Sequence, residues 1–173
     1  MLFERDLKEL PMTMKVILGK LRLKLRAEQV VVLNLLLKSN RKFTFIQLGT
    51  GFGKSRGIIG PLSDAVRWAT GAKSIVIVPN RILRATNQEY CIEANQAEIE
   101  LTDPNCVGTF YCTYEQFLRL QHMIPTNSNI FVDEGHLYFK EKAIQVERKA
   151  VVPPEILKKF ARVYILSATF GGQ

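Results

Sequence analysis

The segment Leu48-Gly-Thr-Gly-Phe-Gly-Lys-Ser55 is a glycine-rich turn that ends in a lysine and a serine. Small residues allow consecutive backbone N–H groups to turn inward around an anion, a lysine adds a point charge on the outer phosphates, and a serine hydroxyl can hold Mg²⁺. An apolar run precedes this turn and a helix-like stretch follows it, so a bound phosphate would lie at a helix N-terminus. The segment alone is also compatible with a plain strand-to-helix turn.

Two further apolar runs end in polar side chains. Residues 129–132 lead into Asp133-Glu134-Gly135-His136, and residues 163–166 lead into Ser167-Ala168-Thr169. Ligands of an open parallel sheet bind outside the carboxyl ends of its strands. At such a position Asp133 can hold Mg²⁺ through water, and Glu134 can orient and deprotonate an attacking water. Each segment could singly be ordinary loop chemistry, but the three in this order favour a nucleotide site.

Together these segments resemble the first RecA-like domain of superfamily 2 helicases and translocases, the DEAD/DExH-box group. Residues 51–55 are similar to motif I, 133–136 to motif II in its D-E-x-H form, and 167–169 to motif III. Residues 79–83 resemble motif Ia, the region around Thr113 resembles motif Ib, and Leu25 to Gln29 resembles the upstream element whose glutamine reads adenine. The resemblance covers residues 25–169.

The resemblance implies that the chain binds ATP and Mg²⁺ and assigns a role to each matching position. Glu134, Lys54 and Asp133 would be catalytic, and Ser55 and Asp133 would hold the metal. His136, Ser167 and Thr169 would couple hydrolysis to movement. The nucleic-acid contacts would come from Pro79, Arg81 and Thr113. The residues that would contact the nucleotide are Gly49, Thr50, Gly51, Phe52, Gly53, Lys54, Ser55 and Gln29.

The chain departs from the family pattern at three positions. Leu48 replaces a small residue, Phe52 puts an aromatic side chain between two loop glycines, and Gly135 stands where alanine is common. None of the three removes a phosphate, metal or water ligand, although Phe52 is expected to alter packing of the loop or nucleotide affinity.

Alternating apolar and polar stretches predict the fold. We expect strands at 43–48, 74–78, 98–101, 107–110, 129–133 and 162–166, and helices at 28–38, 54–70, 81–95 and 113–122, with a short helix starting at 153–154. Alternation of strands and helices implies a parallel sheet covered on both faces. Together with this pattern, the resemblance implies a three-layer α/β/α RecA-like P-loop NTPase domain over residues 25–173, with a mainly parallel central sheet and an N-terminal helical extension over residues 1–24.

The composition and the net charge indicate where the protein is located and what kind of molecule it binds. The 173 residues are 47% hydrophobic, enough to bury one core, and they carry a net charge of +8, which favours RNA or DNA as a partner. The basic cluster of residues 15–26 is interpreted as a solvated face, whereas Arg81 and Arg84 are the better phosphate contacts. Three cysteines without metal spacing, a charged start and no long apolar run predict an intracellular protein, cytoplasmic or nuclear, without a zinc site or membrane insertion.

Several functions remain open at this stage. The chain would be the ATP-hydrolysing half of a nucleic-acid helicase, or of a motor that resembles the SecA protein translocases, or a domain that binds nucleotide without turnover. His136 favours the nucleic-acid branch, because motif II of the SecA group lacks a histidine, and a small-molecule kinase is a more distant alternative. Nothing in the chain resembles a second RecA-like domain with its arginine finger, so the resemblance implies a monomeric fragment with weak ATPase activity of its own.

Overall fold

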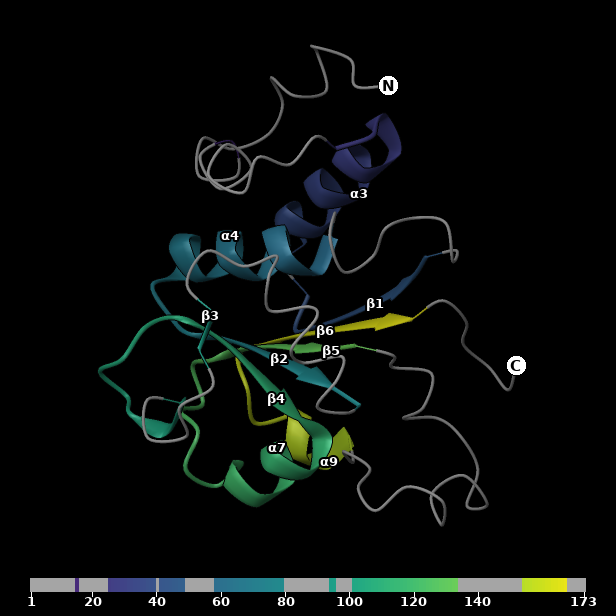
Figure 1. Ribbon diagram of the computed structural model, residues 1–173. Coiled ribbons are helices and arrows are strands. Elements are labelled where there is room, and N and C mark those ends of the chain that lie inside the picture. The colour runs from purple at the N-terminus through teal and green to yellow at the C-terminus, as the bar shows by residue number, and fades with distance from the viewer. Residues whose placement is uncertain are drawn as a thin grey trace, which may run out of the picture.

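The structure is a computed structural model that describes residues 15, 25–39, 41–48, 58–79, 94–95, 101–133 and 154–167. Within these residues a parallel sheet lies between two layers of helices (Figure 1). None of the described helices is both long and apolar enough to cross a bilayer.

The central sheet has six strands, and every pair of neighbouring strands is parallel. In spatial order they are β1 (Phe43–Gln47), β6 (Arg162–Ser167), β5 (Asn129–Val132), β2 (Ser74–Val78), β4 (Thr109–Thr113) and β3 (Ala94–Asn95). The first and the last of the described strands along the chain are therefore hydrogen-bonded neighbours. The chain crosses from β1 to β2 and leaves two places between them, which β5 and β6 fill.

Helices cover both faces of this sheet, as Figure 1 shows. Helices α3 (Ala27–Lys38) and α4 (Gly60–Thr70) lie above the sheet in that view, and α7 (Tyr114–Leu120) and α9 (Pro154–Leu157) lie below it. This arrangement confirms the prediction of a three-layer α/β/α domain, and the described sheet is parallel throughout.

Alternate side chains of each strand enter two separate cores. In β2, Val76 and Val78 pack with α3 and α4, whereas Ile75 and Ile77 pack with α7 and α9. Because both faces of the strand are covered, all five of its residues are buried, as expected for a parallel sheet.

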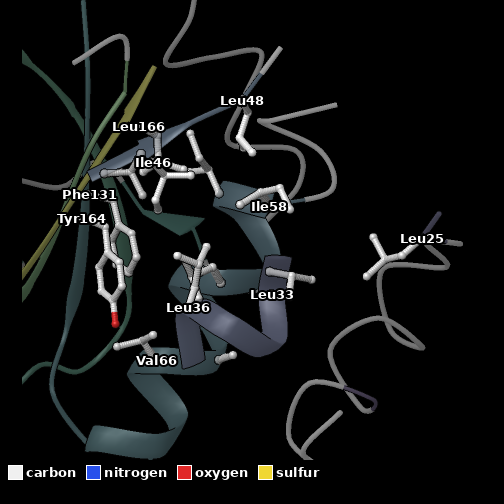
Figure 2. Packing of buried hydrophobic residues seen from close by; sticks show 14 of the residues in the cluster. Leu25, Leu33, Leu36, Ile46, Leu48, Ile58, Val66, Phe131, Tyr164 and Leu166 are labelled. Atoms are coloured by element: carbon white, nitrogen blue, oxygen red, sulfur yellow. The ribbon is translucent and has the colours of Figure 1, made fainter. Parts of the chain in front are cut away.

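The core on the α3 and α4 side contains an aromatic pair from two neighbouring strands. The rings of Phe131 on β5 and Tyr164 on β6 are stacked, with centroids 4.8 Å apart and planes 5° from parallel (Figure 2). Around them lie aliphatic side chains from the sheet and both helices, including Leu33, Leu36, Ile46, Ile58, Val66 and Leu166.

Helix α4 begins and ends with residues suited to those positions. Pro61 lies in the first turn of α4, where the N–H that proline lacks has no partner within the helix. Gly71 ends the helix with a φ of 68°, and its N–H donates to the carbonyl of Arg67 over 2.9 Å. The left-handed conformation at this position favours glycine over residues with a side chain.

A buried polar cluster ties α4 to the sheet. The hydroxyl of Thr109 donates to Oδ1 of Asp64 over 2.5 Å, and Nε of Arg67 donates to the same hydroxyl oxygen over 3.1 Å. Nη2 of Arg67 lies 3.6 Å from Oδ1 of Asp64, so the cluster contains an ion pair, and all three residues are buried. These bonds fix the position of α4 over the start of β4.

A buried lysine holds the connection ahead of β4 against the sheet. Nζ of Lys73 donates to the carbonyls of Leu101 and Asp103 over 2.7 and 2.8 Å and lies 5.1 Å from the ring centroid of Phe110. Desolvation lowers the pKa of Lys73 below its ordinary value, while Cys106 and Asp103 act in the opposite direction.

Among the described residues, the observed elements agree with the predicted ones except between residues 94 and 113. The predicted N-terminal extension 1–24 apart from residue 15, the start of the helix predicted at 54–70, residues 81–93 of the next helix and residues 98–100 of the next strand lie outside the described residues. Residues 94 and 95, predicted as the end of a helix, form the short strand β3, because they pair with the outer side of β4. Leu101, predicted to end a strand, is helical, and its carbonyl turns to Lys73 and not to a neighbouring strand. The strand predicted at 107–110 begins at Thr109 and runs to Thr113, because its register is set by pairing with β2.

The buried ion pair of Asp64 and Arg67 should contribute far more to stability than the exposed pair of Arg26 and Glu28. Asp64→Asn leaves the Arg67 guanidinium in the core without its counter-charge, so we expect a loss of about 3–5 kcal/mol in the free energy of unfolding. Glu28→Gln removes a pair at 3.3 Å whose side chains are about half exposed, and it should cost less than about 1 kcal/mol. Urea denaturation of both variants measures the difference, and equal losses would contradict this account.

Candidate functional site

The carboxyl ends of the strands gather the described candidate residues along one edge of the sheet, here called the carboxyl edge. β5 ends immediately before Asp133, β6 ends at Ser167, β2 leads into Pro79, and β4 ends at Thr113. The fifth long strand, β1, leads through Leu48 toward the glycine-rich segment 49–55. Because all these strands are parallel, their polar exits lie on the same side of the molecule.

The last hydrogen bond between β1 and β6 brings the approach to the glycine-rich segment beside Ser167. The N–H of Leu48 donates to the carbonyl of Ser167 over 2.8 Å, and both residues are buried. β6 lies between β1 and β5, and neighbouring strands are about 4.8 Å apart, so the ends of β1 and β5 are separated by roughly 10 Å. Strand ends that are 80 or more residues apart in the sequence are therefore brought to within roughly 10 Å of each other.

Asp133 is held by its backbone on both sides. Its N–H donates to the carbonyl of Ile77 over 2.9 Å, and its carbonyl accepts from the hydroxyl of Tyr114 over 2.6 Å. The residue is 2% exposed. Carboxylate and hydroxyl oxygens are the ligands that Mg²⁺ prefers in proteins, so Asp133 and the serine and threonine side chains of this edge suit that cation chemically.

Thr113 caps helix α7. Its hydroxyl accepts from the backbone N–H of Gln116 over 3.2 Å, and its own N–H donates to Oε1 of Gln116 over 3.0 Å. This reciprocal pair is a capping box, the arrangement typical of a threonine followed three residues later by a glutamine at a helix start. The cap explains why α7 starts at Tyr114 and points the Tyr114 hydroxyl at Asp133.

Gln29 has a comparable local role at the start of α3. Its Oε1 accepts from the N–H of Arg26 over 2.9 Å, and the residue is 6% exposed. The side-chain oxygen of Gln29 therefore already accepts one hydrogen bond at the start of α3.

The remaining predicted site residues lie outside the described part of the chain. They are Gly49, Thr50, Gly51, Phe52, Gly53, Lys54, Ser55, Arg81, Glu134, His136 and Thr169. Of the predicted set, the structure describes Gln29, Pro79, Thr113, Asp133 and Ser167, and it brings the last four to the carboxyl edge.

The sequence analysis missed Tyr114, whose hydroxyl supports the backbone at Asp133. The two residues are on different strand ends and 19 positions apart, and the only local signal was the Thr-x-x-Gln capping pattern that begins one residue earlier. That pattern predicts the helix start but not the long-range hydrogen bond.

Comparisons with known proteins find similarity to solved structures. No protein-family model matches the chain, and no curated protein matches it. Among solved structures, the chain is similar to the crystal structure of the yeast DEAD-box splicing factor Prp28, with 14% sequence identity and a TM-score of 0.49. The match covers 91% of this chain and 43% of that one, so the chain spans less than half the length of Prp28 in that crystal structure.

The Tyr114 hydroxyl should stabilise the fold through its bond to Asp133. Tyr114→Phe leaves a buried carbonyl without this donor, and we expect a loss of about 1–3 kcal/mol in the free energy of unfolding. The control is Tyr164→Phe, because the Tyr164 side chain is also buried but its hydroxyl has no hydrogen bond to the described residues. Urea denaturation compares the two, and a loss in Tyr164→Phe as large as that in Tyr114→Phe would contradict the assigned role.

Proposed function

We propose that this chain is the nucleotide-binding domain of a helicase-type motor, which binds ATP with Mg²⁺ and hydrolyses it while holding RNA or DNA. The observation that carries the proposal is the order of strand ends at the carboxyl edge. β6, which ends at Ser167, lies between two strands. On one side is β1, which leads toward the glycine-rich segment, and on the other is β5, which ends immediately before Asp133. A phosphate cradle, a metal-binding carboxylate and a coupling hydroxyl would then occupy neighbouring positions.

The proposed roles follow from the chemistry of each side chain. The backbone N–H groups of segment 49–53 would surround the β-phosphate, and the Lys54 ammonium would neutralise charge on the outer phosphates. The oxygens of Ser55 and Asp133 would hold Mg²⁺, which when bound neutralises charge on the phosphates. Glu134 would orient and deprotonate the attacking water.

The remaining proposed residues would connect hydrolysis to movement along a track. Ser167 lies beside the approach to the glycine-rich segment, and Ala168 and Thr169 follow it in the sequence. The hydroxyls of Ser167 and Thr169 would respond to a change in the bound phosphates and transmit it to the rest of the motor. Pro79 and Arg81 follow β2, and Thr113 ends β4, farther along the same edge, where they would contact the nucleic-acid backbone. A second RecA-like domain would supply the arginine that completes the site.

Nucleotide binding should depend on Lys54. Lys54→Ala removes the charge on the outer phosphates, and no neighbouring lysine in segment 48–55 replaces it, so ATP affinity should fall at least about tenfold while the fold is retained. Isothermal titration with Mg·ATP measures the affinity, and circular dichroism checks the fold. Unchanged affinity in folded Lys54→Ala would contradict the phosphate cradle.

Glu134 should affect turnover and not binding. Glu134→Gln keeps the size of the side chain but removes the base, so the variant should bind Mg·ATP normally and lose at least about a hundredfold in hydrolysis rate. Rates should be measured with RNA, DNA and unfolded polypeptide as separate additions. Stimulation by polypeptide alone would favour a protein translocase, and normal hydrolysis by Glu134→Gln would exclude its role as the base.

A further inference from the structure

Two segments far apart in the sequence have the same basic composition. Residues 38–42 read Lys-Ser-Asn-Arg-Lys and residues 158–162 read Lys-Lys-Phe-Ala-Arg, so each has three basic residues in five and no acidic one. The first segment joins α3 to β1, and the second joins α9 to β6. Neither belongs to the carboxyl edge.

The β1 and β6 pairing brings these segments together at the amino ends of the strands. Phe43 is paired with Val163, and the N–H of Val163 donates to the carbonyl of Lys42 over 2.8 Å. Lys42 immediately precedes β1 and Arg162 is the first residue of β6, so their backbones are neighbours at the start of this strand pair. A strand of five residues is about 16 Å long, so this amino edge lies well apart from the carboxyl edge.

The charges at this edge have no counter-charge among the described residues. Arg41, Lys42 and Lys158 are exposed, Arg162 is half-buried, and no described carboxylate forms an ion pair with any of them. Lys159 is not counted with these residues, because its Nζ donates to Oε1 of Gln121. Lys42 and Arg162 are the two basic residues whose backbones lie next to each other. Like charges on neighbouring strands are unfavourable unless an anion lies between them.

An exposed aromatic side chain lies on β1, three residues after Lys42. Phe45 is 56% exposed, and its ring stacks on that of Phe43 with centroids 6.5 Å apart. β1 is the outermost strand on this side of the described sheet. Phe45 shares its face of β1 with Phe43, three residues along the chain from Lys42. Basic residues and an exposed aromatic ring at this spacing can bind one single strand of nucleic acid, because the cations hold phosphates and the ring stacks on the base of another nucleotide.

We propose that this amino edge is a second nucleic-acid contact, in which Arg41, Lys42, Lys158 and Arg162 bind the backbone of a single strand and Phe45 stacks on one of its bases. The choice of nucleic acid as the bound polyanion rests on the proposed function. The contact itself uses none of the residues of the carboxyl edge. The contact would hold the strand whether or not nucleotide is bound.

The salt dependence of binding tests the electrostatic part. Fluorescence anisotropy of a labelled 12-nucleotide single strand, without nucleotide, gives the slope of log affinity against log salt concentration. Each phosphate contact contributes about 0.7 to that slope for a single strand, so Lys42→Gln/Arg162→Gln should reduce it by about 1.4 and Lys158→Gln by about 0.7. The charge control is Arg26→Gln, which lies at the opposite end of α3 and should leave the slope unchanged.

Phe45→Ala tests the stacking part with a separate readout. Affinity should fall at least about fivefold with an unchanged salt slope, because stacking involves no counterion release. Leu35→Ala, which truncates an equally exposed apolar side chain on α3, should leave affinity unchanged. Thermal melting confirms that each variant is folded.

Three results would overturn the inference: an unchanged slope in both basic-edge variants, an equal change in Arg26→Gln, or binding to phosphatidylserine vesicles in preference to the oligonucleotide. Nucleotide binding is measured separately with Lys54→Ala. A failure of the proposed nucleotide site would leave these slopes as predicted, whereas a failure of the amino edge would leave ATP affinity dependent on Lys54.

Discussion

The hydrogen-bonded pairing of β1 with β6 is the constraint on which the rest of the molecule depends. It joins residues about 120 positions apart and inserts the last strand between β1 and β5. At one end of the pair, the Leu48 to Ser167 bond aligns the approach to the glycine-rich segment with the strand that neighbours Asp133. At the other end, the bond from Val163 to Lys42 brings two basic segments together. Both proposed contacts therefore depend on one register.

The two faces of the sheet keep this register in place. Shifting β6 by one residue would move Tyr164 from the core beneath α3 and α4 to the opposite core, and its stacking on Phe131 would be lost. The same shift would turn polar residues at the end of β6 toward the apolar interior. The helices thus contribute to the site indirectly, because they make any other alignment of the strand ends costly.

Local sequence patterns predicted the strands whose ends are marked by a change in residue type. β2 was predicted at its observed residues, and β1 and β5 to within one, because each apolar run ends at polar or conformationally restricted residues. The end of α4 was predicted from Gly71. Asp133 and Ser167 could be placed at strand ends for the same reason.

The remaining features could not be predicted because they depend on contacts between distant segments. β4 is buried along its whole length, so its start carries no periodic signal and is fixed by pairing with β2. β3 exists because β4 offers it a partner. The support of Asp133 by Tyr114 and the proximity of Lys42 and Arg162 likewise follow from topology, and no window of sequence contains both members of either pair.

The central position of β6 also has a consequence for biosynthesis. During translation β1 emerges more than 100 residues before β6, so β1 has no strand to pair with for most of the synthesis of residues 43–167, and β5 joins it as an unpaired neighbour of the vacant place before β6 is made. Until residues 162–167 leave the ribosome, both flanking strands present unpaired N–H and C=O groups, and Phe131 lacks its stacking partner. The nascent chain should consequently recruit chaperones that bind exposed strand edges, and it should become resistant to proteases only when the last strand has been inserted.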